Sequence, residues 1–371
     1  MKRFLFLFTL LFILACNPDT TDTGIDLPAP VSFDRQAMLT DWADRIIIPA
    51  YEDFATQTQQ MREAADALVE QPSEETYQQL VTSWRTTYKG WQRVSMFEIG
   101  KAESLSLRNK MNIYPADITS INENVATADY NLDLPSAVDE QGFPALDYLL
   151  HGLMEDDLTI ASFYRGDDAD KHRSYIQVLA HRIDDLTDEV LNDWKTNFRA
   201  TFIENDGNSA TASVDKIVND FVFYYEKALR AGKIGIPAGV FSGEPLSDRV
   251  EALYADDYSK VLFLTALNAA QDFFNGSAYG SGEAGEGLRT YLEALGTEKN
   301  GQPLATVIDQ QFEAAKTAAN QLGDSFRQQV ETDNIAMLTA YDALQLNVVN
   351  LKVDMLQAMN VNVDYVDADG D

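Results

Sequence analysis

The chain has 371 residues and carries 59 Asp and Glu against 28 Lys and Arg, a formal net charge of −31. Nucleic-acid binding needs Lys and Arg to neutralise phosphates, and the sequence has no basic run, so a nucleic-acid partner is excluded. Hydrophobic residues make up 45% and aromatic residues 11% of the chain. This is enough for a sizeable core, which excludes a disordered acidic polypeptide.

The N-terminus has the features of a bacterial lipoprotein leader. Lys2 and Arg3 precede an apolar stretch over residues 4–14, which is shorter than the ~20 residues that span a bilayer. We therefore predict a signal peptide over residues 1–15. The stretch ends in Ile-Leu-Ala before Cys16, which resembles a lipobox. Cys16 is the predicted lipidation site, and the alternative is a soluble secreted protein cleaved nearby.

Lipidation would anchor the chain to a membrane of the cell envelope. Asn17 follows the cysteine, in place of the Asp that retains some lipoproteins at the inner membrane. We therefore expect the outer membrane, with the protein facing the periplasm or the surface. Residues 16–32 are rich in Asp, Thr and Pro and are predicted to form a flexible tether. Cys16 is the only cysteine, which excludes an internal disulfide.

Helical periodicity dominates from residue 33 onward. The first amphipathic pattern runs through Pro49, which we expect to kink or split the helix. Ser73 is predicted to cap the next long helix at its N-terminus. Trp84, Tyr88 and Trp91 lie on one stripe of that helix. The stripe could form a platform for haem or a sugar, but its helical spacing favours a place in the core.

The pattern predicts an all-α protein made of two helical-bundle domains with long irregular connections. Residues 100–143 are irregular, and such long insertions are often functional. No alternation typical of strands is sustained. Helical patterns then recur over residues 144–151, 157–165, 170–203, 213–231, 247–275, 284–295, 303–331 and 333–359.

We place the N-terminal bundle at residues 33–204 and the C-terminal bundle at 210–360, because residues 205–209 read as a loop. Residues 361–371 form an acidic tail. Its Asp-rich end resembles the start of a calcium loop, but the chain stops before the Glu that such a loop needs. A solvated tail is the default interpretation.

Several segments, in order and spacing, resemble imelysin and the imelysin-like envelope proteins. They are Trp42 to Tyr51, Trp84 to Trp91 with Glu98-Ile-Gly100, Gly142 to Leu150, Lys233 to Gly239 and Phe274-Asn275-Gly276. The resemblance implies two related helical bundles with a pocket at their junction. It also implies either a metallopeptidase or a component of iron uptake. The family motif is Gly-x-His-x-x-Glu, whose His and Glu are proposed to bind metal.

This chain departs from the motif at both metal ligands. Gly142 and Phe143 match, but Pro144 replaces the His and Asp147 replaces the Glu. One interpretation is a short capped helix from Gly142 to Gly152, with Pro144 in its first turn and Asp147 stabilised by the helix dipole. The other is that Gly142, Asp147 and Glu98 line a shared pocket, in which the two carboxylates bind a polar ligand or a metal.

The three histidines allow further metal sites. Asp147 and His151 are four residues apart, and His181 is followed at the same spacing by Asp185 and Glu189. Either set could place oxygen and nitrogen donors on one helix face. The alternatives are a solvated helix face for the His181 set and a dipole-stabilised C-terminal position for His151.

Two functional hypotheses remain. The first is a non-enzymatic envelope lipoprotein that captures a ligand in iron or haem acquisition, with iron-uptake components as partners and a divalent cation or iron as the candidate cofactor. The alternative is a metallopeptidase of the imelysin type, which needs a metal-activated water and a general base. The Pro at position 144 weighs against the alternative.

Overall fold

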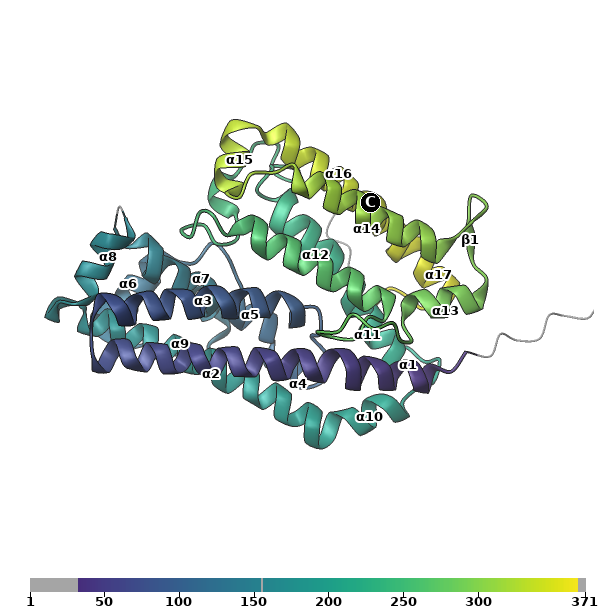
Figure 1. The fold of residues 1–371 in the computed structure, drawn as a ribbon, viewed down its shortest axis with the longest axis horizontal. Helices are drawn as coiled ribbons and strands as arrows, with labels where there is room; N and C mark the ends of the chain where they lie inside the picture. Colours follow the sequence, from purple (N-terminus) through teal and green to yellow (C-terminus); the bar gives the residue numbers. More distant parts are fainter. Residues whose placement is uncertain (1–32, 155, 366–371) are drawn as a thin grey trace, which may run out of the picture. The chain divides into compact units, whose positions relative to one another are not determined.

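The amphipathic segments fold into helices, as predicted (Figure 1). The structure is a computed structural model that describes residues 33–154 and 156–365. In this part of the chain the only strands are β1 (Glu298–Lys299) and β2 (Gln302–Pro303), which form a short antiparallel hairpin. The all-α class is therefore confirmed.

The first half combines three long helices, α2, α3 and α9, with many short ones. In chain order its helices are α1 (Arg35–Asp41), η1 (Trp42–Ile47), α2 (Ile48–Glu70), α3 (Glu74–Val94), α4 (Lys101–Leu105), α5 (Leu107–Met111), α6 (Ile118–Thr127), η2 (Pro135–Glu140), α7 (Gly142–Asp147), η3 (Tyr148–Gly152), α8 (Asp157–Tyr164), η4 (Asp167–Ala169), α9 (Asp170–Asp193), η5 (Trp194–Phe198) and α10 (Arg199–Glu204).

The second half contains fewer helices than the first. They are α11 (Ser213–Phe223), η6 (Tyr224–Gly235), η7 (Ser247–Arg249), α12 (Ser259–Asn275), α13 (Leu288–Leu295), α14 (Leu304–Asn320), α15 (Phe326–Thr332), α16 (Asn334–Val349), η8 (Asn350–Met355) and α17 (Leu356–Met359).

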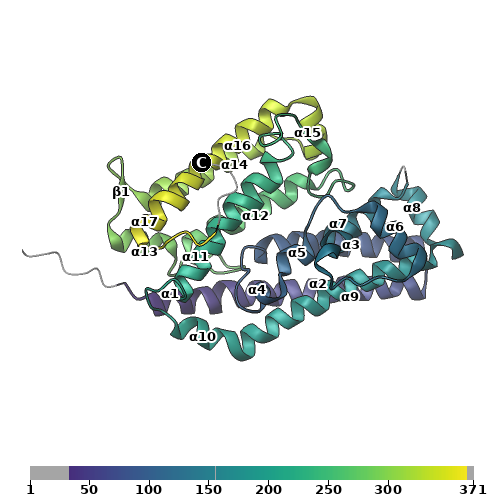
Figure 2. The ribbon, with the colours of Figure 1, turned by 180° about the vertical axis from the view of Figure 1, so that it is seen from behind.

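The long helices form two packed groups. Helix α2 packs between α3 and α9, while α14 packs against α12 and α16 (Figures 1 and 2). Helix α12 also packs against α3, so helices of both predicted domains are in direct contact. The division into bundles at residues 33–204 and 210–360 stays a prediction.

Pro49 does not split the first helix. Helices α1, η1 and α2 follow one another without a break, and Pro49 lies at the start of α2, directly after a π-helical stretch. A proline removes one N–H and leaves the carbonyl four residues earlier without its usual donor. Here that carbonyl belongs to Arg45, and it accepts the backbone N–H of Tyr279 at 2.8 Å. A distant loop thus takes the place of the missing helix bond.

Two predicted helices are too long. The segment predicted as 247–275 becomes helical as α12 only at Ser259, and the segment 303–331 is interrupted between α14 and α15. In the first case the backbone N–H groups of Tyr254 and Ala255 donate to the side chain of Asp147. These donors are therefore committed to a partner outside their own segment, and the chain stays irregular there.

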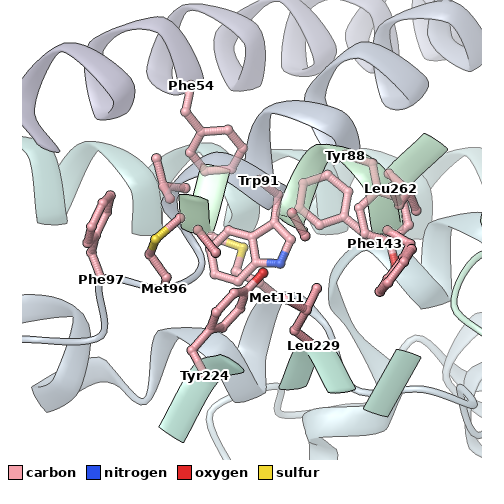
Figure 3. Packing of buried hydrophobic residues seen from close by; sticks show 14 of the residues in the cluster. Phe54, Tyr88, Trp91, Met96, Phe97, Met111, Phe143, Tyr224, Leu229 and Leu262 are labelled. Atoms are coloured by element: carbon pink, nitrogen blue, oxygen red, sulfur yellow. The ribbon is translucent and has the colours of Figure 1, made fainter. Parts of the chain in front are cut away.

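The aromatic stripe of α3 lies in the core. Trp84 and Tyr88 are fully buried and Trp91 is 1% exposed, so the core interpretation is confirmed. Figure 3 shows Trp91 among Phe54, Tyr88 and Phe143. The Tyr88 and Phe143 rings stack with centroids 4.6 Å apart. This aromatic packing fastens α3 to α2 and α7.

The segments predicted at the two ends of the chain are described only in part. The predicted signal peptide (1–15), Cys16 and the tether (16–32) lie outside the described residues, as does the Asp-rich end of the tail. The start of the tail is not simply solvated. Tyr365 Oη donates to Glu226 at 2.8 Å, and its ring packs edge-on against Phe223. Among the described residues, no helix combines the length and the apolar character needed to cross a membrane.

The predicted cap of α3 is formed, and it can be tested by mutation. Ser73 Oγ accepts the backbone N–H of Thr76 at 3.1 Å. Because this satisfies one of the free donors of the first turn, Ser73→Ala should lower the free energy of unfolding by about 1 kcal/mol. Urea denaturation measures this. Ser174→Ala, in the exposed interior of α9, is the matched control and should have little effect.

Candidate functional site

The segment that matches the family motif forms one short helix made of α7 and η3, from Gly142 to Gly152. Gly142 has φ 75°, and a Cβ at this position would lie 2.3 Å from the carbonyl oxygen of Met111. Pro144 is buried in the first turn, where its missing N–H costs nothing. Gly142 therefore has a structural reason to be glycine, and the predicted short helix is confirmed.

Asp147 is buried and holds a distant loop. Its carboxylate accepts the backbone N–H of Tyr254 at 2.9 Å and that of Ala255 at 2.8 Å. Burial raises the pKa of Asp147 to about 7, while the two N–H groups and the charge of Arg85 oppose the rise. Asp147 thus fastens the loop before α12 onto α7, and it does not act on its own helix dipole as expected.

Glu98 belongs to a different cluster. Its carboxylate pairs with Arg108 at 3.1 Å, and Arg108 also binds Asp220 at 2.8 Å. The backbone N–H of Glu98 donates to Asp220 at 2.6 Å. Glu98 follows α3 and faces α11, whereas Asp147 faces the loop before α12. The two carboxylates have different partners in the described part of the chain, and a pocket shared by Glu98 and Asp147 stays a prediction.

The residues at the motif positions do not fit a metal centre. Pro144 offers no donor atom, and both oxygens of Asp147 already accept backbone N–H groups. Across residues 33–154 and 156–365, no three His, Cys, Asp or Glu side chains converge as metal ligands would.

The histidines have separate partners as well. His151 Nδ1 contacts Asp157 at 3.2 Å, and His181 Nε2 contacts Asp66 at 2.6 Å. Asp185 pairs with Arg62, and Glu189 pairs with Lys101. Burial lowers the pKa of His151. The predicted pairs therefore do not form a joint ligand set.

A cavity of about 330 Å³ lies between the two halves of the chain, beside the core shown in Figure 3. Its walls come from the end of α3, from residues 108–114 and from η6. Trp91, Tyr114 and Tyr224 supply aromatic surface. Four basic side chains and no acidic ones line it, namely Arg108, Lys227, Lys233 and Arg249. We call it the junction cavity.

A buried ion pair lies beneath the junction cavity, and only its lysine lines the cavity. Lys233 and Glu251 are 3% and 2% exposed and are in direct contact. Gln92 Nε2 donates to Glu251 at 3.0 Å, and Asn112 Nδ2 donates to it at 2.7 Å. Burial lowers the pKa of Lys233, and the Glu251 charge opposes that change. The carboxylate thus has a donor from α3, a donor from the 108–114 segment and a cation from η6.

These residues were not singled out from the sequence. Lys233 begins one of the segments that carry the family resemblance, but the sequence predicted no role for its side chain. Glu251 falls in a stretch that reads as helix, and nothing in its neighbourhood indicates a buried carboxylate. Gln92 and Asn112 become partners of Glu251 only through contacts between segments far apart in the chain.

The sequence model of the imelysin family matches residues 47–351. The chain belongs to the imelysin family. A search of curated proteins found no match.

Two solved structures share the fold. A "putative iron-regulated protein A precursor" from Parabacteroides distasonis aligns with a TM-score of 0.72 and 18% identity, covering 90% of this chain and 97% of that one. An imelysin-like protein from Psychrobacter arcticum aligns with a TM-score of 0.68 and 18% identity, with the same coverage. At this identity the likeness concerns the imelysin fold alone.

In this imelysin, the ion pair under the junction cavity is expected to be essential for stability. Lys233→Met leaves Glu251 buried without its counter-charge and should lower the free energy of unfolding by about 3–5 kcal/mol. Urea denaturation measures the loss. The control is Lys195→Met, which breaks an exposed pair with Glu52 and should cost less than about 1 kcal/mol. Equal losses in the two variants would contradict the assignment.

Asp147 is expected to make stability depend on pH. Its pKa rises from the ordinary 3.8 to about 7 on folding, so the folded state binds more protons between these values. The contribution of Asp147 to stability should therefore fall as the pH rises through this window, by up to about 1.4 kcal/mol per pH unit.

The test compares the natural protein with Asp147→Asn by urea denaturation across this pH window. The difference in unfolding free energy, natural protein minus variant, should decrease as the pH rises. Asp168→Asn, at an exposed position, should show no such trend. A difference that is constant or grows with pH would show that Asp147 is ionised throughout.

Proposed function

We propose that this imelysin is a non-enzymatic, ligand-binding protein of the cell envelope that serves iron or haem acquisition. In this proposal Cys16 carries the lipid that anchors it, and the junction cavity holds the ligand. The observation that carries the proposal is the lining of that cavity. Four basic side chains face it and no acidic one does, in a chain with 59 acidic and 28 basic residues.

The lining favours an anionic organic ligand. The carboxylates that pair with these basic groups, such as Asp220 and Glu251, do not line the cavity. An anionic group inside the cavity would therefore contact the cations and not the carboxylates. Its hydrogen bonds with these cations would be charge-assisted, and such bonds are stronger than neutral ones. Arg249, whose side chain is 48% exposed, lies where it can receive an entering anion.

The size of the junction cavity limits the size of the ligand. Its volume of about 330 Å³ lies near the lower end of the range for ligand sites, which is roughly 300–1,000 Å³. A small carboxylate chelate of iron suits this space better than a haem macrocycle. Trp91, Tyr114 and Tyr224 offer flat surfaces for the apolar part of such a ligand.

The residues do not support the peptidase alternative. The motif positions lack a metal-binding pair, because Pro144 has no donor atom and Asp147 is committed to backbone N–H groups. The iron connection is supported by the name of the Parabacteroides relative, which describes that protein as iron-regulated. Iron-uptake components are the partners that this role implies.

Ferric citrate is the first ligand to test, with tryptophan fluorescence as the readout because Trp91 lines the cavity. We expect ferric citrate to quench the tryptophan fluorescence of the purified mature protein saturably. Ala228→Phe fills the junction cavity and should abolish binding, and Arg249→Gln should weaken it about tenfold. Ala210→Phe, in an exposed loop, is the control and should bind normally.

Binding that survives Ala228→Phe would place the ligand elsewhere. If neither ferric citrate nor haemin binds at millimolar concentration, the proposal fails. A casein assay with added zinc or iron tests the alternative, and hydrolysis that Asp147→Ala abolishes would establish a peptidase instead.

A further inference from the structure

A second and larger cavity, of about 840 Å³, lies on another side of α3. It is bounded by α2, α3, α12 and the glycine-rich loop over residues 276–287. Its apolar lining residues include Met96 and Phe97, which lie at the end of the core shown in Figure 3. It shares no lining residue with the junction cavity. We call it the α3 groove.

Two cations face the α3 groove from consecutive turns of α3. Lys89 and Arg93 both line it, and both side chains are half-buried. Neither forms an ion pair or a side-chain hydrogen bond with any residue in the described part of the chain. Other basic side chains of this acidic protein do pair with carboxylates, for example Arg108, Arg199 and Lys299.

The repulsion between these two cations is unfavourable in the free protein, although the carboxylates of Asp53 and Asp272 line the same groove. Like charges four residues apart on a helix repel each other, and partial burial removes some of the water that would screen them. An anion placed between Lys89 and Arg93 would relieve both costs. The pair therefore has the properties of a receptor for an acidic group.

The wall opposite these cations is fixed in place. Tyr279 is held by its backbone N–H, which donates to Arg45, and by its hydroxyl, which donates to Asp53. The N–H of Glu286 donates to Asp41 at 2.8 Å. The glycine-rich loop is thus tied at both ends to the first helix, so the groove exists before any ligand binds.

The groove also offers hydrogen-bond acceptors. Asp272 lines it and has no side-chain partner among the described residues. Desolvation raises the pKa of Asp272, and the charges of Lys316 and Arg93 oppose the rise. Since Lys316 and Arg93 already act on Asp272, a neutral hydroxyl group of a ligand suits this carboxylate better than a further cation.

We propose that the α3 groove binds a hydroxylated organic acid. Its acidic group lies between Lys89 and Arg93, and its hydroxyl groups donate to Asp272 across the groove. The acidic group is a carboxylate or a phosphate, since both accept hydrogen bonds from Lys and Arg. This site is independent of the junction cavity and of the function proposed for it.

Isothermal titration calorimetry tests the proposal. The mature protein is titrated separately with glucuronate, glucose 6-phosphate and glucose. At least one of the two acids should bind, and glucose should bind at least about tenfold more weakly because it lacks the acidic group. The tighter acid identifies the carboxylate or the phosphate as the recognised group. Lys89→Gln and Arg93→Gln should each weaken acid binding about tenfold.

Two controls separate this site from other basic positions. Lys110→Gln changes a half-buried lysine that lines a different cavity, and Arg249→Gln changes the junction cavity. Neither should alter acid binding. The melting temperatures of Lys89→Gln and Arg93→Gln should change little, because neither side chain forms an ion pair or a side-chain hydrogen bond with a described residue.

Three results would overturn the proposal. They are the absence of binding by both acids at millimolar concentration, equal binding of glucose and the acids, and acid binding that survives both α3 substitutions. None of these results bears on ferric citrate in the junction cavity, so the two proposals fail separately.

Discussion

One buried carboxylate organises the centre of this protein. Glu251 is 2% exposed and accepts hydrogen bonds from Gln92 and Asn112, and it contacts the ammonium group of Lys233. A charge in such a place is tolerated only when its partners are all in position. The three elements that supply these partners must therefore pack together around Glu251. They are α3, residues 108–114 and η6, and they also form the walls of the junction cavity. The cavity is thus a consequence of satisfying one charge.

The same requirement governs the irregular segments. The loop before α12 has backbone N–H groups that no helix satisfies, and the carboxylate of Asp147 accepts two of them. The glycine-rich loop uses the opposite arrangement, because Pro49 leaves the carbonyl of Arg45 free for the N–H of Tyr279. Buried backbone groups need partners. In both loops the partner lies far away in the sequence, which explains why the loops have fixed positions without regular structure.

Local patterns were enough to predict much of the fold, and long-range pairing explains the errors. The cap at Ser73, the buried stripe through Trp84 and the short helix after Gly142 each depend on residues within a few positions of one another. The start of α12 and the different partners of Glu98 and Asp147 do not. They are decided by Arg108 and by the backbone after Glu251, whose positions only the folded chain reveals. For the same reason the sequence predicted an acidic site, whereas the junction cavity is lined by cations.

Helix α3 contributes residues to two cavities. With 3.6 residues per turn, Lys89 and Arg93 fall on one face, while Gln92 and Ser95 fall on another. Trp91, which Figure 3 shows in the aromatic core, also lines the junction cavity. In the junction cavity the cations are balanced from behind by carboxylates such as Glu251, so the cavity is stable when empty. In the α3 groove Lys89 and Arg93 form no ion pair with any described residue, although the carboxylates of Asp53 and Asp272 line the same groove. An anion bound there would therefore be a new partner for both cations.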